Sequence, residues 1–411
     1  MMSRPTPRSL PVRPGPIGVA DVAAAMQQLL DGDSRPVAIA PAALNHGPAE
    51  HHAAAMAAAL REDAPIDHDE AALVVATSGS TGEPQGVLIS LPALVAAADR
   101  GAGELGAPGL WLAAVPVTGI GGILAVVRSI RAGFRPIALP SVGGAGPFAP
   151  AEFAMAAHQT LRHAEALGVP AYVSLVPTQL RRLLAHDGPA ADELARFGAV
   201  VVGGAALPEE DIAAAADRGV RLVASYGATE TCGGVIYNGK PLPGVGLAFQ
   251  DPETGALSPQ GPGRIVISGP TLALGYRLRR DLTSAAFLPD GFHSPDYGHL
   301  APGRVVVESR LDQIVKVGGV KVSLSAVTNA LRAHPRVVDA VTVAEPDAEW
   351  GSVPASYVVT DASEVGGGAL REELLAIIAD RLGRASQPRH IHLVPSLPLG
   401  HTGKAKPPAG S

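Results

Sequence analysis

Short apolar runs alternate with longer stretches of helical periodicity over the first 225 residues. The runs at 73–76, 172–176 and 199–202 predict strands that are buried on both faces. Apolar residues three and four apart between such runs predict helices, for example at 19–30 and 48–60. Strands that alternate with helices indicate a parallel sheet with helices on both faces. The other strands predicted in this part of the chain are 36–39, 86–89, 111–115, 135–138 and 222–225.

The pattern changes near residue 233 and again near residue 311. Glycine, proline and short strands such as 263–268 and 304–308 fill the region between these points, which predicts a small β-rich subdomain. The rest of the chain predicts a compact α+β module. Its helices are expected at 323–333 and 370–382, and its strands at 337–343, 355–360 and 390–394.

These elements predict an α/β protein with two domains and a tail. The large N-terminal domain covers 18–309, is built from parallel sheets with flanking helices, and includes the β-rich subdomain at about 233–308. The small C-terminal domain covers 310–411. Residues 1–17 carry arginines among prolines, with no apolar run after them. We therefore expect a flexible tail there and no signal peptide.

Composition and charge exclude several classes of protein. The 411 residues include 48 glycines and 38 prolines, yet 47% are apolar, so the chain can bury a core and is neither collagen-like nor disordered. The net charge of -6 gives no sign of a nucleic-acid partner. A single cysteine excludes an internal disulfide and a four-cysteine zinc site, and it fits a reducing, cytoplasmic setting.

Two stretches match familiar signatures by letter but not in context. Residues 105–127 carry no charge and are long enough to cross a bilayer, but two prolines and five glycines spoil a spanning helix. We expect a strand at 111–115, a loop and a helix from about Gly122 there, with no membrane insertion. Residues 101–106 have the glycine spacing of a dinucleotide motif, but they follow a predicted helix and not a strand. They are expected to end that helix, which begins near Pro92 with Ser90 as its cap.

Small and hydroxyl-bearing residues connect two of the predicted strands. The run from Thr77 to Gly82 lies between the strands at 73–76 and 86–89. Backbone N–H groups in such a loop converge into a nest that binds anions, and serine and threonine add hydroxyl donors suited to phosphate. The sequence therefore predicts a phosphate-binding turn between two strands.

This run resembles the phosphate loop of the ANL superfamily of adenylate-forming enzymes, which includes acyl-CoA synthetases, luciferases and peptide-synthetase adenylation domains. Later segments resemble the other motifs of that superfamily in the same order, so the resemblance spans about residues 70–408. One departure concerns Gln85, because the family usually has a lysine at that position. The change removes one positive charge near the β- and γ-phosphates of ATP.

The resemblance implies an ATP site assembled from several segments. Tyr226 would stack on adenine, Thr229 would bind the α-phosphate, and Glu230 would hold Mg²⁺. Mg²⁺ prefers one or two carboxylates together with phosphate oxygens, which suits a lone glutamate. Asp296 would accept both ribose hydroxyls, although Pro295 stands where the family usually has glycine. The other residues assigned to ATP or AMP are Thr77, Ser78, Gly79, Ser80, Thr81, Gly82, Gly203, Gly204, Ala205, Gly227 and Arg310.

Two further motifs imply a mobile C-terminal lid. Residues 309–319 resemble the hinge motif, with Asp312 as the pivot. Gly318 and Gly319 would let CoA approach the backbone closely, where any Cβ would obstruct it. Residues 397–404 resemble the C-terminal lysine motif, in which Lys404 would bridge the substrate carboxylate and the α-phosphate. The lid would rotate between the two half-reactions.

The implied activity is that of an acid–CoA ligase that uses ATP, Mg²⁺ and CoA and releases AMP and pyrophosphate. The short N-terminal part and the segments 172–180 and 229–237 resemble bacterial o-succinylbenzoate–CoA ligases, which act in menaquinone biosynthesis. The acyl pocket would include Ser174, Ala228 and Gly119. Many relatives have histidine in place of Gly119, so its absence predicts a wider pocket.

Two alternatives stay open. One is a CoA ligase for another aryl or acyl carboxylic acid, which the missing histidine at Gly119 favours. The other is a nucleotide-binding pseudoenzyme, which Gln85 and Pro295 favour and the presence of Lys404 and Glu230 opposes. The expected partners are small molecules only. The sequence leaves the oligomeric state open, with a homodimer as one alternative.

Overall fold

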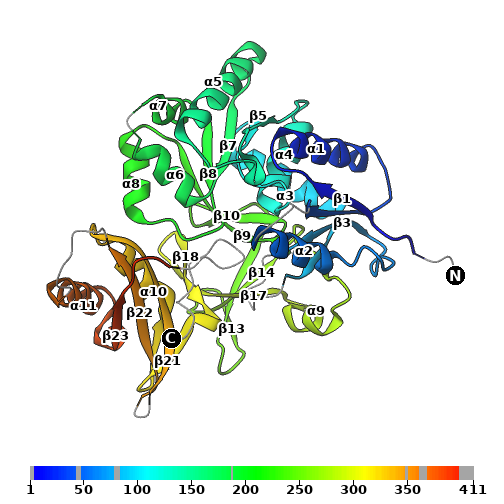
Figure 1. Ribbon diagram of the computed structural model, residues 1–411. Coiled ribbons are helices and arrows are strands. Elements are labelled where there is room, and N and C mark those ends of the chain that lie inside the picture. Colours follow the sequence, from blue (N-terminus) through cyan, green and yellow to red (C-terminus); the bar gives the residue numbers. More distant parts are fainter. Residues whose placement is uncertain are drawn as a thin grey trace. The chain divides into compact units, whose positions relative to one another are not determined.

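The computed structural model of the chain describes residues 4–42, 48–77, 84–186, 188–347, 350–360 and 368–397 (Figure 1). The chain divides into two compact units. Unit 1 comprises Met1–Leu247 and Val266–His293, and unit 2 comprises Ala248–Ile265 and Ser294–Ser411. The hinge expected at Asp312 therefore lies inside unit 2, and the division of the chain at residues 309 and 310 stays a prediction.

The first sheet of unit 1 has five strands in the order β1-β2-β3-β4-β15. Strands β1, β2 and β3 are parallel, and β4 and β15 extend the sheet in antiparallel fashion. Side chains of β2 alternate between two apolar clusters, with Ile39 on one face and Ala38 on the other. The strands are β1 (Arg8–Val12), β2 (Val37–Pro41), β3 (Ala71–Ala76), β4 (Gly86–Ser90) and β15 (Gly275–Tyr276).

The flexible tail predicted for residues 1–17 is wrong from Arg8 onward. Strand β1 pairs with β2, and helix α1 begins at Pro16. Along β1, Leu10 and Val12 turn toward the protein while Ser9 and Pro11 are exposed. This alternation is a strand pattern that the arginines and prolines conceal, and an edge strand tolerates proline because it needs fewer ladder bonds.

The second sheet of unit 1 has seven strands in the order β11-β10-β9-β8-β7-β5-β6. Strands β9, β8, β7, β5 and β6 are parallel, which confirms the predicted sheet. The antiparallel strands β10 and β11 extend it beyond the prediction. The strands are β5 (Leu110–Ala113), β6 (Ile137–Ala138), β7 (Ala171–Leu175), β8 (Ala199–Val202), β9 (Leu222–Ala228), β10 (Gly233–Tyr237) and β11 (Lys240–Pro241).

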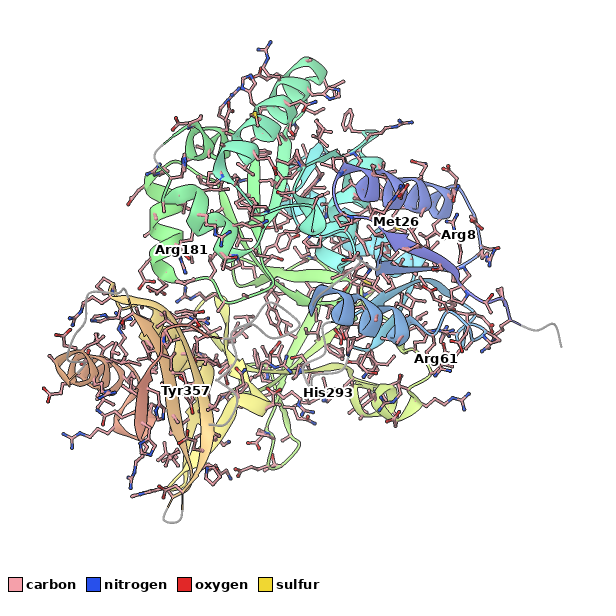
Figure 2. All side chains as sticks on the ribbon, in the orientation of Figure 1. Arg8, Met26, Arg61, Arg181, His293 and Tyr357 are labelled. Carbon is pink, nitrogen blue, oxygen red and sulfur yellow. The ribbon has the colours of Figure 1, made fainter. Side chains whose placement is uncertain are left out.

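Helices form the remaining layers of unit 1. Helices α1, α3 and α4 lie between the two sheets, and their apolar faces form one hydrophobic core with both sheets. Met26 of α1, labelled in Figure 2, belongs to this core and is 1% exposed. Helix α2 covers the other face of the first sheet, and α5 to α8 cover the outer face of the second (Figure 1). The helices are α1 (Pro16–Leu30), α2 (Pro48–Leu60), α3 (Leu91–Leu105), α4 (Ile120–Arg131), α5 (Pro150–Leu167), α6 (Pro177–Leu184), α7 (Pro189–Ala195) and α8 (Glu209–Asp217).

The structure decides both ambiguous stretches. The Ser90 hydroxyl accepts a 3.2 Å bond from the backbone N–H of Ala93, as expected for the cap of α3. That helix continues through Gly101 and ends at Gly106, so the glycine motif lies mostly within a helix. In the part of the chain that the structure describes, no helix is long and apolar enough to cross a membrane.

A third sheet follows in the region predicted to be β-rich. Its order is β13-β12-β14-β17-β16, with β18 beside β17. The elements are β12 (Gly246–Gln250), β13 (Leu257–Ser258), β14 (Gly263–Ser268), helix α9 (Arg280–Ala286), β16 (Phe287–Leu288), β17 (Gly291–Ala301) and β18 (Arg304–Arg310).

The C-terminal part of unit 2 is the predicted α+β module. Its sheet has the order β20-β19-β22-β21, with β23 parallel to β22. Helices α10 and α11 pack on this sheet through Val327, Leu331, Leu374 and Ile378. The hairpin of β19 and β20 is additional to the predicted elements. The elements are β19 (Ile314–Val317), β20 (Val320–Ser323), α10 (Leu324–Arg332), β21 (Val337–Asp347), β22 (Gly351–Thr360), α11 (Gly368–Leu382) and β23 (His390–Leu393).

Candidate active site

The base of the predicted phosphate loop joins two antiparallel strands. The backbone N–H of Thr77 donates to the Gln85 carbonyl at 2.8 Å, and the Gln85 N–H donates to the Thr77 hydroxyl at 3.4 Å. A Cβ on Gly86 would lie 2.6 Å from the Ala59 carbonyl oxygen of α2, so this strand start accepts only glycine without a shift. The predicted loop residues Ser78, Gly79, Ser80, Thr81 and Gly82 lie outside the described residues.

The side chain of Gln85 faces an arginine that the sequence analysis did not select. Arg279 Nη1 lies 3.5 Å from Gln85 Oε1. The same guanidinium forms two hydrogen bonds with Asp281, of 3.0 Å from Nε and 2.8 Å from Nη2. The hydrogen bonds from Arg279 lower the pKa of the Asp281 carboxyl to about 2. A positive charge therefore stands beside the position where the family usually carries its lysine.

The carboxyl ends of the parallel strands bring the predicted adenine segments together. Gly203 directly follows β8, and its N–H donates to the Leu175 carbonyl of β7 at 3.2 Å. A Cβ on Gly203 would lie 2.9 Å from the carbonyl oxygen of Ser225, the neighbour of Tyr226 in β9. Gly204 has a φ of 83°, a backbone conformation that favours glycine. Tyr226 is half-buried, and Ala205 and Gly227 are exposed.

The turn after β9 fixes the predicted metal carboxylate. Thr229 and Glu230 lie in a short 3₁₀ turn, Thr229–Thr231, that the Thr231 hydroxyl ties to Ala228 and Gly233. The Tyr276 hydroxyl donates to Glu230 Oε1 at 2.8 Å, and the Ala273 N–H donates to the Glu230 carbonyl at 2.8 Å. Among the described residues no group of three histidine, cysteine or acidic side chains gathers as a metal site.

Cys232 ends this turn. Its backbone has a φ of 52°, and its side chain is fully buried. Desolvation raises the pKa of the thiol, which stays protonated and has no part in the chemistry proposed below.

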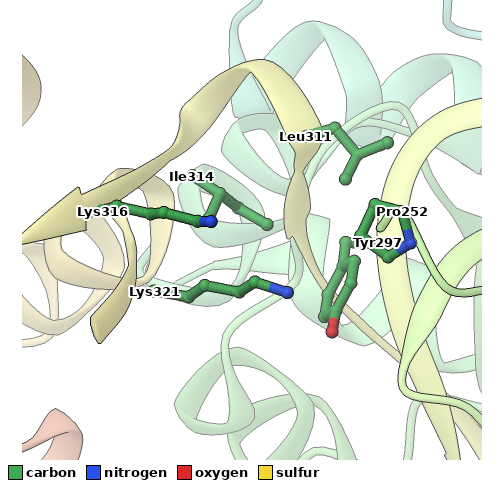
Figure 3. Close-up of a pocket in the computed structure, with 6 residues that line it drawn as sticks. All are labelled: Pro252, Tyr297, Leu311, Ile314, Lys316 and Lys321. Carbon is green, nitrogen blue, oxygen red and sulfur yellow. The ribbon is translucent and has the colours of Figure 1, made fainter. Parts of the chain in front are cut away.

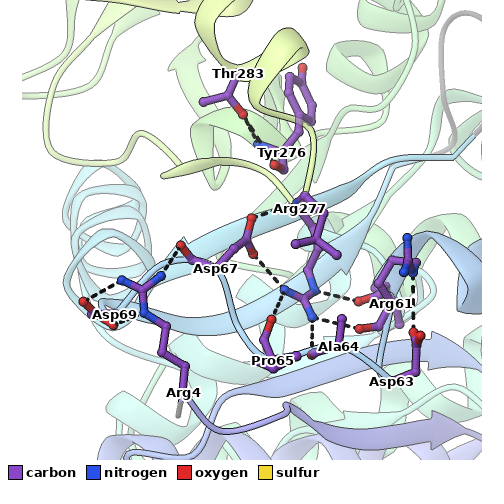
Figure 4. A network of polar contacts seen from close by, with 12 residues as sticks. Arg4, Arg61, Asp63, Ala64, Pro65, Asp67, Asp69, Tyr276, Arg277 and Thr283 are labelled. Carbon is purple, nitrogen blue, oxygen red and sulfur yellow. Dashed lines mark hydrogen bonds and ion pairs between the residues drawn. The ribbon is translucent and has the colours of Figure 1, made fainter. Parts of the chain in front are cut away.

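Arg277 anchors the segment that carries Tyr276 (Figure 4). The Arg277 side chain is 0% exposed, and it forms an ion pair of 2.7 Å with Asp67. A guanidinium has five N–H donors, and here all five are used. Besides Asp67, the acceptors are the carbonyl oxygens of Leu60, Arg61, Ala64 and Pro65, at 2.6 to 3.0 Å.

The predicted acyl-pocket residues lie near the same edge of the second sheet. Ser174 is buried within β7, and Ala228 is the half-buried last residue of β9. Gly119 precedes α4 with a φ of -110°, and a Cβ there would meet nothing closer than a carbonyl oxygen at 3.8 Å. Neither backbone strain nor crowding therefore demands glycine at this position. Gln179 ties the ends of β7 and β5 by 3.0 Å bonds to the Val176 N–H and the Ala114 carbonyl.

In unit 2, two predicted ribose residues face each other across a strand pair. Asp296 of β17 is paired with Arg310 of β18. Arg310 Nε also lies 3.0 Å from Asp312 Oδ1. Asp312, the expected pivot of the hinge, is therefore an ion-pair partner of Arg310, which is expected to bind ribose or phosphate. Asp312 itself lies in a 3₁₀ turn directly after β18.

The two glycines of the hinge motif form the turn of the β19–β20 hairpin. Their φ angles of 55° and 87° match a two-residue turn that needs positive φ at both positions. A Cβ on Gly318 would lie 2.4 Å from the Trp350 ring, whereas a Cβ on Gly319 would meet nothing within 4 Å. Gly318 thus has a packing role, and Gly319 presents an open backbone.

A cavity of about 130 Å³ lies beside this hairpin within unit 2 (Figure 3). Lys321 Nζ lies 6.0 Å from the centre of the Tyr297 ring, and Lys316 Nζ lies 3.4 Å from Glu253 Oε1. Pro252, Leu311 and Ile314 complete the lining. The sequence predicts no role for these residues. Lys404, the predicted catalytic lysine, lies outside the described residues.

Comparison with known proteins agrees with this architecture. A protein of Mycobacterium tuberculosis named "Probable 2-succinylbenzoate--CoA ligase" is 36% identical over 386 residues, which are 92% of this chain and 91% of that protein. A 2-succinylbenzoate–CoA ligase of Enterococcus faecalis is 30% identical over 362 residues, 83% of this chain and 69% of that protein.

Two solved structures share the fold. The o-succinylbenzoate CoA synthetase of Bacillus subtilis in complex with its acyl-adenylate intermediate has a TM-score of 0.75 at 21% identity, over 98% of this chain and 87% of the other. The amide bond synthetase McbA of Marinactinospora thermotolerans has a TM-score of 0.75 at 23% identity, over 98% and 89%. At these identities the likeness shows the fold alone.

Family comparison accounts for most of the chain. Residues 17–277 match the family described as AMP-binding enzyme, and residues 326–404 match the AMP-binding enzyme C-terminal domain. Together with the 36% identical relative, these matches show that the chain belongs to the AMP-binding enzyme family.

Proposed function

We propose that the chain is an ATP-dependent o-succinylbenzoate–CoA ligase that forms an acyl-adenylate and then a CoA thioester. The observation that carries the proposal is the 36% identity to a relative of that name over 92% of this chain. The placement of Gly203, Tyr226 and Glu230 at the carboxyl edge of one parallel sheet supports it, because ligands of such sheets bind at that edge.

In the first half-reaction, a carboxylate oxygen of the acid attacks the α-phosphorus of ATP. The bond from that phosphorus to the bridging oxygen breaks, and pyrophosphate leaves with the electron pair. Unit 1 supplies Tyr226 for the adenine, the Thr229 hydroxyl for the α-phosphate and Glu230 for Mg²⁺. The metal would neutralise phosphate charge, and the lone carboxylate that Tyr276 holds suits it. Lys404 brings a second positive charge to the two reacting anions.

In the second half-reaction, the sulfur of CoA gives up its proton to water and attacks the carbonyl carbon of the acyl-adenylate. The bond from that carbon to the phosphate oxygen breaks, and AMP leaves with the electron pair. This step needs the lysine out of the way and a path for the thiol. The exposed turn at Gly319 suits such a path, because no atom lies within 4 Å of the position that a Cβ on Gly319 would occupy. Asp312 is the proposed pivot, and its exposed pair with Arg310 is easily exchanged for another partner.

The acid is the less constrained part of the proposal. The open space at Gly119 favours the second candidate, a ligase for another aryl or acyl acid, since no side chain narrows the pocket there. A CoA-ligation assay with o-succinylbenzoate beside a panel of aryl and fatty acids separates the candidates. We expect kcat/KM for o-succinylbenzoate to exceed that for every other acid by at least about 10-fold.

Other outcomes of this assay have definite meanings. A higher kcat/KM for a different acid would replace o-succinylbenzoate as the substrate. Binding of ATP without thioester from any acid would favour the nucleotide-binding pseudoenzyme. The variant Gly119→His is a second probe, since its side chain would enter the open space and lower activity toward bulky acids first.

A further inference from the structure

We propose that Arg279 binds the β- and γ-phosphates of ATP and supplies the positive charge that Gln85 lacks. The inference rests on the proposed use of ATP, and it concerns a residue to which neither the sequence motifs nor the comparisons give a role. Arg279 is thereby a substrate-binding residue of the adenylation step.

The position of Arg279 supports this role. Arg279 Nη1 lies 3.5 Å from Gln85 Oε1, and Gln85 is bonded through its backbone to Thr77 by contacts of 2.8 and 3.4 Å. Thr77 and Gln85 are the residues where β3 ends and the chain returns to β4. The guanidinium therefore lies at the base of the predicted phosphate turn, next to Gln85, the residue that replaces the usual lysine of the family.

The backbone that carries Arg279 is held in place by its neighbours. Arg277, two residues earlier, is locked by five hydrogen bonds to residues 60–67. Leu278 has a φ of 53°, and its N–H donates to Asp67 Oδ2 at 2.8 Å. The Thr283 hydroxyl donates to the Arg279 carbonyl at 2.9 Å. These contacts turn Arg277 inward and leave Arg279 42% exposed beside Gln85.

The present contact between Arg279 and Gln85 is weak. A bond of 3.5 Å to a neutral amide oxygen is at the long limit for a hydrogen bond, whereas a guanidinium and a phosphate oxygen carry opposite charges and form a shorter and stronger one. Asp281 holds the guanidinium through Nε and Nη2, which orients Nη1 toward Gln85. A phosphate oxygen can therefore displace the Gln85 amide without breaking the pair with Asp281.

The test compares the affinity of the full chain for ATP and for AMP by titration calorimetry with Mg²⁺ present. Arg279→Ala should weaken ATP binding by about 10- to 100-fold and leave AMP binding within about twofold, because AMP lacks the phosphates in question. Arg280→Ala is the matched control: it removes the same charge from the next, exposed residue and should change neither affinity.

Rescue provides the second measurement. Gln85→Lys restores the family's lysine, and in the Arg279→Ala background it should recover most of the lost ATP affinity. The same substitution in the wild-type chain should change ATP affinity much less, so that the two positions show strong coupling. Loss of ATP and AMP affinity together, or a failure of Gln85→Lys to rescue, would overturn the proposal.

These measurements need no acid and no CoA. If the wild-type chain binds ATP and the variants behave as expected but no acid is ligated, the proposed ligase activity fails and the role of Arg279 stands. If o-succinylbenzoate is ligated and Arg279→Ala matches wild type in ATP affinity, the ligase activity stands and the role of Arg279 fails.

Discussion

Two charged regions, one in each unit, differ in how far their charged side chains are buried and how many partners these side chains have. In unit 1, Arg277 is fully enclosed, and each of its five N–H donors meets an acceptor. In unit 2, the hinge region carries Arg310, Lys316 and Lys321 in exposed pairs with Asp312 and Glu253. Lys316 is 65% exposed, against 0% for Arg277.

The two regions show which charges hold a fold together and which can change partner. An exposed pair contributes about 0–1 kcal/mol, whereas breaking a buried pair costs about 3–5 kcal/mol because the remaining groups are left without partners in the interior. The region around Arg277 positions Tyr276 and Arg279 on a fixed backbone. The pairs of the hinge region cost little to break, which suits a segment proposed to rotate.

The largest effect is expected from Arg277→Met. The substitution removes the buried charge and takes one donor away from Asp67 and from each of four carbonyl oxygens, so the free energy of unfolding should fall by about 3–5 kcal/mol. Urea denaturation measures the change. The exposed pair of Arg13 and Asp21 is the control, and Arg13→Met should cost less than about 1 kcal/mol. Equal costs for the two variants would contradict the comparison.

The hinge region should instead affect the second half-reaction. Gly319→Leu is expected to slow thioester formation from supplied acyl-adenylate by about 100-fold while pyrophosphate release changes little, because the substitution blocks the proposed thiol path and leaves the adenylation site unchanged. The control is Gly303→Leu, since Gly303 also has positive φ, 77°, in a hairpin of unit 2 with nothing within 4 Å of its Cβ position. Both variants carry the same backbone strain, so equal losses would assign the effect to strain.

Lys404→Ala should slow the first half-reaction and spare the second, which is the opposite of the effect expected from Gly319→Leu. Pyrophosphate release should fall by at least about 100-fold, because the charge proposed to act on the reacting phosphate is lost, while CoA should still react with supplied acyl-adenylate. Stopped assays of each half-reaction measure both rates. Equal loss in the two half-reactions would remove the proposed role of this lysine.

A smaller effect is expected from Tyr276→Phe, which frees one oxygen of Glu230 from its 2.8 Å bond. Loss of a group that orients a metal ligand typically costs 10- to 100-fold, so kcat/KM for ATP should fall by about 10-fold and the Mg²⁺ requirement should rise. Tyr357→Phe removes a comparable contact to Glu345 in unit 2 and should leave both unchanged. An unchanged Mg²⁺ requirement in Tyr276→Phe would show that Glu230 needs no such support.

The smallest effect concerns the exposed pair of Arg279 and Asp281. The pKa of Asp281 in the folded chain is about 2, below its ordinary value of 3.8, so the pair stabilises the fold above about pH 4 and this contribution is lost as the pH falls toward 2. Urea midpoints of wild type and Asp281→Asn should differ slightly at pH 5 and converge with acidification. A difference that grows in acid would mean that the pair does not lower this pKa.

The sequence predicts those parts of the fold that have a local signal. The apolar run of β8 and the serine cap of α3 are local, and both are confirmed at the expected residues. Strand β1 was not predicted because arginine and proline interrupt its alternation of apolar and polar residues. The β19–β20 hairpin was not predicted because its glycines resemble a binding motif.

The contacts around the candidate site are harder to predict because they join distant parts of the chain. Arg277 bonds to residues more than 200 positions away, and Arg279 meets Gln85 across 194 positions. Nothing near Arg279 in the sequence marks it as different from Arg280. The pairing of β15 with β4 brings this segment next to the base of the predicted phosphate turn.

The enclosed thiol of Cys232 has a practical consequence for measuring lid rotation. The chain has one cysteine, and the pKa shift of the folded state keeps its sulfur as the unreactive thiol. Maleimide dyes will therefore attach only to cysteines that are introduced at exposed positions of the folded protein. The natural chain is thus a ready background for a pair of fluorescent labels, one in each unit, whose energy transfer would follow the lid through a catalytic cycle.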